Sequence, residues 1–133
     1  MKIKRTTPLL VVDAIEPLLS LWRDQLGYTV VVDVPHGEHL GFALLAHDDQ
    51  QVMFQTRDSL RDDCPEVAAL GPTSLLYTDV DSLDEAMRAM AGAERLIGPR
   101  TTFYGAREAF FKTASGHVVA FAESAPAASP EGG

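Results

Sequence analysis

The chain has 133 residues, which suits one compact domain or two small halves that share a core. Its hydrophobic content of 46% is that of a globular protein, and its formal net charge of −8 argues against binding to nucleic-acid phosphates. A single cysteine excludes an internal disulfide, and no apolar run approaches the roughly 18 residues of a membrane span, so we expect a soluble cytoplasmic protein.

The first half of the chain predicts one strand, one helix and three further strands. Residues 7–13 predict a strand, because they are apolar and β-branched and end at an aspartate. A helix follows, since apolar residues recur at spacings of three and four from Ile15 to Leu26 and a glycine stops the pattern. Trp22 lies on this apolar stripe, which indicates a core residue. The next three strands are predicted over residues 28–34, 40–46 and 51–56.

A polar and acidic segment, residues 57–71, comes next and is interpreted as a linker between two halves. The only cysteine, Cys64, lies in this segment among carboxylates. Because nearby carboxylates raise the pKa of a thiol, we interpret Cys64 as incidental and not as a reactive thiolate. At the other end of the chain, residues 125–133 are rich in Ala, Pro and Gly and are predicted to be disordered.

The second half repeats the order of the first. Residues 73–79, Thr-Ser-Leu-Leu-Tyr-Thr-Asp, match residues 7–13, Thr-Pro-Leu-Leu-Val-Val-Asp, with Thr, Leu, Leu and Asp in register. A helix is predicted from Leu83 to Met90. Three strands are predicted after it, over residues 95–99, 106–113 and 117–123.

This repeat predicts an α+β fold of two βαβββ modules, residues 1–56 and 72–124, within one domain. The two modules would form a curved mixed sheet around one cleft, so that equivalent positions of the halves face each other. The last strands also match, with Met53 corresponding to Ala120. A ferredoxin-like or other α+β fold with accidental internal similarity is the alternative.

Four motifs, in order between residues 5 and 124, resemble those of a known superfamily. They are Val12-Asp13-Ala14-Ile15-Glu16, Leu21-Trp22-Arg23-Asp24-Gln25-Leu26-Gly27-Tyr28, Tyr77-Thr78-Asp79-Val80-Asp81 and Tyr104-Gly105-Ala106-Arg107-Glu108. The first pair resembles the opening, and the second pair the later part, of glyoxalase/bleomycin-resistance/extradiol-dioxygenase (vicinal oxygen chelate) proteins. The resemblance implies the paired βαβββ fold and favours a homodimer, in which the long linker would permit an exchange of modules.

Metal-using members of this superfamily place a histidine or similar ligand on the first strand of each module and a glutamate on the last. Carried onto this sequence, these positions fall on Thr7 and Thr73 and on Met53 and Ala120. None of the four has an imidazole or a carboxylate, so we predict no metal and no cofactor. The histidines do not replace them, because we interpret all four as surface residues: His36, His39, His47 and His117.

The remaining chemistry predicts a mostly apolar binding cleft with a few polar atoms. Strand alternation and the resemblance nominate its ligand-binding residues: Thr7, Leu9, Met53, Gln55, Thr73, Tyr104, Glu108 and Ala120. Glu108 is the one weak catalytic candidate. It follows Arg107 on a strand, so the two side chains point to opposite faces, and an inward carboxylate is either an acid/base group or a structural ion-pair partner.

Three functions remain open at this point. The first is a metal-independent protein of the bleomycin-resistance type that sequesters a cationic or aromatic small molecule, which the charge of −8 would suit. The second is a lyase, isomerase or dioxygenase-like enzyme that uses a metal or the acid/base chemistry of Glu108. The third is a regulatory or structural dimer without a small ligand.

Overall fold

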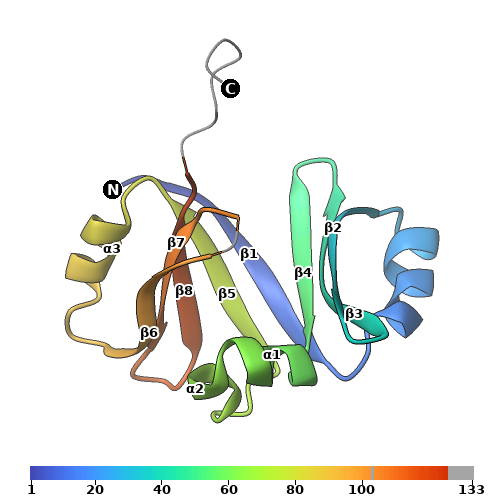
Figure 1. Ribbon diagram of the computed structural model, residues 1–133. Coiled ribbons are helices and arrows are strands. Elements are labelled where there is room, and N and C mark those ends of the chain that lie inside the picture. The colour runs from blue at the N-terminus through green and yellow to red at the C-terminus, as the bar shows by residue number, and fades with distance from the viewer. Residues whose placement is uncertain (103, 126–133) are drawn as a thin grey trace.

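The computed structural model describes residues 1–102 and 104–125, so nearly all of the tail predicted to be disordered lies outside the described residues. Figure 1 shows two curved halves that meet along β1 and β5. The first module contains β1 Ile3–Val12, η1 Glu16–Leu18, η2 Ser20–Gln25, β2 Thr29–His36, β3 His39–His47 and β4 Gln50–Thr56. Between the modules lie α1 Arg57–Asp63 and α2 Pro65–Ala68. The second module contains β5 Ser74–Val80, α3 Leu83–Ala89, β6 Glu94–Thr101, β7 Arg107–Lys112 and β8 Val118–Glu123.

The strands form one mixed sheet in the order β2-β3-β4-β1-β5-β8-β7-β6, which confirms the α+β fold of two βαβββ-like modules. In each module the first strand runs parallel to the last, and β1 and β5 join the modules as an antiparallel pair. Leu9 lies opposite Leu75 in that pair, and the sequence repeat also equates these two residues. The pseudo-twofold axis therefore passes through the Leu9–Leu75 pair.

The prediction of a single helix from Ile15 to Leu26 is wrong, because this segment forms two helices with different hydrogen-bond patterns. A short 3-10 helix, η1, is followed by a π-helix, η2, in which the amide of Leu26 donates to the carbonyl of Leu21. The apolar stripe was interpreted correctly, because Trp22 packs edge-on against Tyr28 and Phe54 on one side of the sheet. In the second module α3 packs on the same side through Leu83.

Residues 57–71, predicted to be a linker between the two halves, contain helices that the sequence analysis did not predict. This segment folds into α1 and α2, which pack on the opposite side of the sheet from η1, η2 and α3. Thr56 caps α1 by accepting a hydrogen bond from the amide of Ser59. Leu60, Cys64 and Val67 are buried, at spacings of four and three residues, so a helical apolar stripe is present inside the acidic composition. Cys64, interpreted as incidental, is a core residue.

The predicted strands are otherwise close to the observed ones, with ends that differ by at most two residues, except that β1 begins at Ile3, four residues before its predicted start. No helix in the described residues is long and apolar enough to cross a membrane.

Candidate binding face

The side of the sheet that carries α1 and α2 is called the concave face below, and Figure 1 shows the two helices at one end of it. Beneath them, Leu9 and Val11 of β1 pack with Leu75 of β5 and Phe110 of β7. The helices contact strands of both modules, since α1 touches β1, β3 and β4 and α2 touches β6. This end of the concave face is therefore closed by apolar packing within the chain itself.

A polar cluster lies on the same face in the second module and consists of Tyr77, Arg100, Tyr104 and Glu108. Glu108 is 3% exposed and accepts a hydrogen bond from the hydroxyl of Tyr77 at 2.6 Å. The hydroxyl of Tyr104 lies 3.2 Å from that of Tyr77, and Tyr104 is 59% exposed. Nε of Arg100 donates to the other oxygen of Glu108 at 2.9 Å. Both carboxylate oxygens are therefore engaged.

The burial of this cluster fixes the protonation of its members. Burial and then the charge of Glu108 raise the pKa of the Tyr77 hydroxyl far above its ordinary value. Burial also raises the pKa of Tyr104. Burial by itself would lower the pKa of Arg100, but the hydrogen bond to Glu108 and the nearby acidic groups leave that pKa raised. The tyrosines therefore remain hydrogen-bond donors and Arg100 remains a cation at neutral pH.

Arg107 and Glu108 point to opposite faces, as predicted. Arg107 lies 3.7 Å from Asp84 of α3, whereas Glu108 is turned to the concave face. An acid/base catalyst needs an oxygen that is free to meet the substrate. Because Tyr77 and Arg100 occupy both oxygens of Glu108, the geometry favours a structural or ligand-binding role for this carboxylate over an acid/base role.

Thr7 holds the one buried side-chain oxygen or nitrogen among the described residues that has no hydrogen-bond partner. Thr7 is 1% exposed and lies directly opposite Tyr77 on the neighbouring strand.

Two residues farther along each strand, Arg5 lies opposite Asp79. Burial raises the pKa of Asp79, although the charges of Arg5 and Lys4 oppose the shift. Strand alternation places Asp79 on the same face as Tyr77, so this part of the face presents a hydroxyl and a carboxylate.

The structure brings together only some of the eight predicted binding residues. Thr7, Tyr104 and Glu108 belong to the polar part of the concave face, whereas Leu9 and Ala120 are buried in the core cluster under α1 and α2. Gln55 is 8% exposed, and its amide donates to the hydroxyl of Ser59 in α1.

The two remaining predicted residues lie at the margin of this face. Met53 is partly buried and packs against the same cluster, and Thr73 is exposed just before β5. The predicted equivalence of Met53 and Ala120 is wrong by two residues. Gln55 pairs with Val11 while Ala120 pairs with Tyr77, and Val11 and Tyr77 are themselves equivalent in the repeat, so the match of Ala120 is Gln55. The closer sequence match lies at the wrong offset, since Val52 and Phe54 coincide there with Val119 and Phe121, and this match concealed the true register.

Two members of the polar cluster, Tyr77 and Arg100, were not predicted. The repeat contained a signal for Tyr77, because Tyr77 stands in the place of Val11, which shares one strand face with the predicted binding residues Thr7 and Leu9. Arg100 lies just beyond the predicted strand 95–99, while the observed β6 continues to Thr101. Arg100 contacts Asp63, which lies 37 residues earlier in the chain, and local sequence patterns do not reveal contacts between such distant residues.

The metal of the glyoxalase-type site does not fit the residues at the expected positions. Thr7 and Thr73 offer hydroxyls, Ala120 offers a methyl group, and the corrected match Gln55 offers a neutral amide whose nitrogen donates to Ser59. Among the described residues, no three His, Cys, Asp or Glu side chains come together in a way that could hold a metal ion. A transition metal in this superfamily needs imidazole and carboxylate donors, and this donor set supplies neither.

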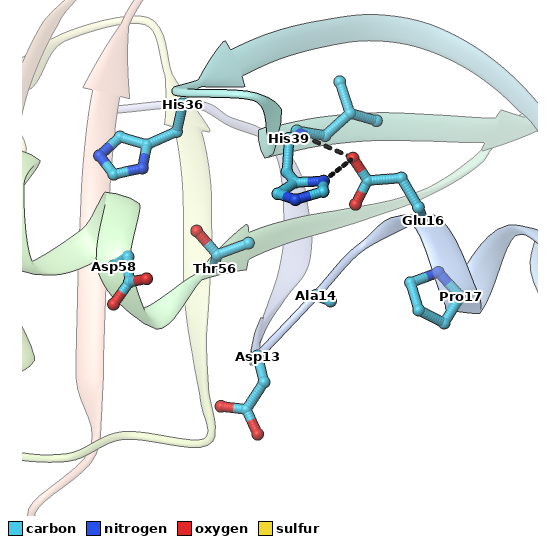
Figure 2. A pocket seen from close by; sticks show the side chains of 9 residues that line it. Asp13, Ala14, Glu16, Pro17, His36, His39, Thr56 and Asp58 are labelled. Carbon is cyan, nitrogen blue, oxygen red and sulfur yellow. Dashed lines mark hydrogen bonds and ion pairs between the residues drawn. The ribbon is translucent and has the colours of Figure 1, made fainter.

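A second feature is a depression of about 290 Å³ in the first module, beside the start of α1. Figure 2 shows Asp13, Glu16, His36, His39 and Asp58 around it. Its polar groups already have partners within the chain: Glu16 accepts from the amide of Leu40, His36 meets Asp62, Asp13 meets Arg57 and Asp58 meets Arg61. His36 is thus hydrogen bonded to a carboxylate, and Nδ1 of His39 lies 3.8 Å from the carboxylate of Glu16.

Raising the pH above about 9 is expected to weaken the fold partly through Cys64. Burial and then the charge of Asp63 raise the pKa of its thiol from 9.0 to about 12. The native thiol keeps its proton up to that pH, while the unfolded chain releases it above about 9. Stability is therefore lost between these two values, by at most about 1.4 kcal/mol per pH unit. Urea unfolding across this range checks the slope, and an equal slope in Cys64→Ala would contradict the assignment.

The mixed sheet of paired βαβββ modules, with a polar cluster on its concave face, defines a glyoxalase-type fold. The family model described as the Glyoxalase/Bleomycin resistance protein/Dioxygenase superfamily matches residues 2–121, and the chain belongs to this superfamily. No curated protein sequence matches the chain significantly.

Solved structures with this fold resemble the chain over nearly its whole length. A superfamily member from Vibrio splendidus 12B01 has a TM-score of 0.69 and 19% identity, covering 92% of this chain and 100% of that one. A hypothetical protein from Bacillus halodurans C-125 has a TM-score of 0.72 and 16% identity, covering 97% and 99%. Methylmalonyl-CoA epimerase from Mycobacterium tuberculosis has a TM-score of 0.67 and 20% identity, covering 90% and 87%. At these identities the likeness shows the fold alone.

Proposed function

We propose that this chain is a metal-independent small-molecule-binding protein of the glyoxalase/bleomycin-resistance type. Its ligand is cationic or aromatic and binds to the polar part of the concave face. The observation that carries the proposal is the hydroxyl of Thr7, which is buried and has no partner among the described residues. Buried hydroxyls in folded proteins are nearly always hydrogen bonded, and an unpaired one costs about 1–3 kcal/mol. Because Thr7 is 1% exposed, a ligand atom reaches its hydroxyl only when the side chains that cover it move aside, and that contact would then remove the penalty.

The groups around Thr7 support the chemical class of the ligand. Tyr77 lies directly opposite and belongs to a hydrogen-bonded pair with Tyr104, so aromatic rings border this part of the face. Asp79 supplies a carboxylate two residues from Tyr77, and the net charge of −8 favours the approach of cations. Aromatic faces and carboxylates together are the groups that recognise organic cations.

A thermal-shift screen of organic cations and aromatic metabolites tests the proposal with wild-type protein and two variants. Thr7→Val is expected to raise the free energy of unfolding by about 1 kcal/mol, because it removes an unpaired buried hydroxyl, and to abolish the shift that a ligand causes in wild type. Thr6→Val is the matched control, since Thr6 is the exposed neighbour on the other face of β1. It should retain the ligand-induced shift.

Two results would contradict the binding of a small molecule at this face. One is a ligand whose binding is undiminished in Thr7→Val, and the other is a complete screen without any stabilising compound. Stoichiometric nickel, zinc, iron or manganese in the purified protein would contradict its metal independence.

The homodimer stays a prediction. The exposed aliphatic side chains of Val31 and Val32 on the edge strand β2 are compatible with it.

A further inference from the structure

Arg100 joins the segment between the modules to the second module. Its Nη1 donates to the carbonyl oxygen of Asp63, the last residue of α1, at 2.9 Å. Its Nη2 lies 3.2 Å from the carboxylate of Asp63 and 3.1 Å from Sγ of Cys64. On the other side, Nε and Nη2 lie 2.9 and 2.8 Å from the same oxygen of Glu108. One guanidinium therefore links α1 to β7.

The surroundings of this guanidinium are those of a site for an organic cation. Glu108 supplies a carboxylate that is 3% exposed, and Tyr77 orients it from the far side. The ring of Phe110 lies below the guanidinium, whose central carbon is 5.7 Å from the ring centroid. A buried carboxylate, an aromatic ring and a second carboxylate from Asp63 are the elements that bind a planar cation in proteins.

The side chain that supplies this cation is partly exposed to solvent. The side chain of Arg100 is 29% exposed, and that of Asp63 is 54% exposed, so the guanidinium lies at the rim of the face and not in its interior. A long arginine side chain reaches water by rotation of its own torsions, without disruption of the strand that carries it. Exchange of this guanidinium for another cation therefore requires no unfolding of β6.

We propose that Glu108, Tyr77, Phe110 and Asp63 form a site for a guanidinium or amidinium group, and that Arg100 occupies this site as an internal ligand. The inference rests on the proposed function, because it assigns one cationic subsite to the same binding face. An external ligand competes with Arg100 for Glu108. Its apparent affinity is therefore reduced by the fraction of molecules in which Arg100 fills the site.

The experiment uses Arg100→Ala and methylguanidinium, a cation that replaces the removed end of the side chain. Titration calorimetry should show that methylguanidinium binds Arg100→Ala at least about tenfold more tightly than wild type, because the internal competitor is gone. Tetramethylammonium, which has the charge but no N–H donors, should bind the variant less tightly than methylguanidinium. Arg95→Ala is the matched control, since Arg95 lies on the same strand outside the site, and it should behave as wild type.

Cys64 provides a second readout, because it is the only cysteine and is 1% exposed. Its modification by a thiol reagent should be at least about tenfold faster in Arg100→Ala, since α1 loses its link to Glu108 and opens more often. Methylguanidinium should slow this reaction again. In the double variant Arg100→Ala, Glu108→Gln it should not, because the buried carboxylate is absent.

Arg100→Gln is studied in parallel, so that misfolding of one variant does not end the test. Equal affinity of methylguanidinium for wild type and for either folded variant would overturn the inference, as would unchanged binding in the double variant. Such a failure differs from a failure of the proposed function. A ligand that depends on Thr7 would still support binding to the concave face, while tight binding of methylguanidinium to Arg100→Ala needs no contribution from Thr7.

Discussion

Replacing Leu60 with alanine is expected to lower the free energy of unfolding by about 3 kcal/mol. Leu60 is 2% exposed and packs in the core cluster that contains Leu9, Leu75 and Phe110. The substitution removes buried methyl groups and leaves a cavity that the sheet below cannot fill, because strands of both modules hold its shape. A segment that served only as a linker would tolerate the same change without loss.

Urea denaturation measures the effect. An unchanged slope of the free energy of unfolding against urea concentration would show that the variant exposes the same amount of surface on unfolding. Leu70→Ala is the matched control, because Leu70 follows α2 in the same segment and is 44% exposed. Its effect should stay within about 0.5 kcal/mol. If Leu60→Ala were no more destabilising than Leu70→Ala, α1 would not be part of the core.

Replacing Glu108 with glutamine is expected to lower the free energy of unfolding by about 2–3 kcal/mol. The carboxylate accepts from Tyr77 with one oxygen and from Arg100 with the other. Glutamine keeps the shape but offers a single accepting oxygen, so one of the two donors loses its partner and Arg100 loses its buried counter-charge. The loss remains below that of a fully buried pair, because Arg100 is partly exposed and retains Asp63.

A double-mutant cycle with Arg100→Met isolates the interaction between the two charges, and we expect a coupling free energy of about 1–3 kcal/mol. Glu94→Gln is the control on the neighbouring strand β6. The carboxylate of Glu94 lies 3.6 Å from Nζ of Lys112, and the side chain of Glu94 is 61% exposed. Exposed ion pairs of this kind contribute little to the free energy of unfolding. A coupling of zero between Glu108 and Arg100 would show that the cluster is not energetically connected.

The fold was predictable from the sequence because the repeat and the strand periodicity are local patterns. Residues 7–13 and 73–79 carry the same signal twice, and the structure confirms it by pairing Leu9 with Leu75. The exact helix type was not predictable. Ile15 to Leu26 has ordinary helical spacing, yet the chain adopts 3-10 and π hydrogen bonding there.

The candidate site was less predictable, because its parts depend on contacts between distant segments. The inward direction of Glu108 followed from alternation, but its partner Arg100 is joined to Asp63 of α1 across the concave face. The acidic composition of residues 57–71 concealed the stripe formed by Leu60, Cys64 and Val67. The many polar residues of this segment favoured a linker, although the helical periodicity of its apolar residues is the stronger signal.

The central position of β1 has a consequence for how the chain folds during synthesis. β1 is made before both of its neighbours in the sheet, β4 and β5, whose residues begin at Gln50 and Ser74. The hairpins of β2, β3 and β4 form from adjacent segments, so they are able to assemble while β1 has no partner. β1 therefore leaves the ribosome with both edges unpaired and completes its pairing only after the residues of β5 have been translated.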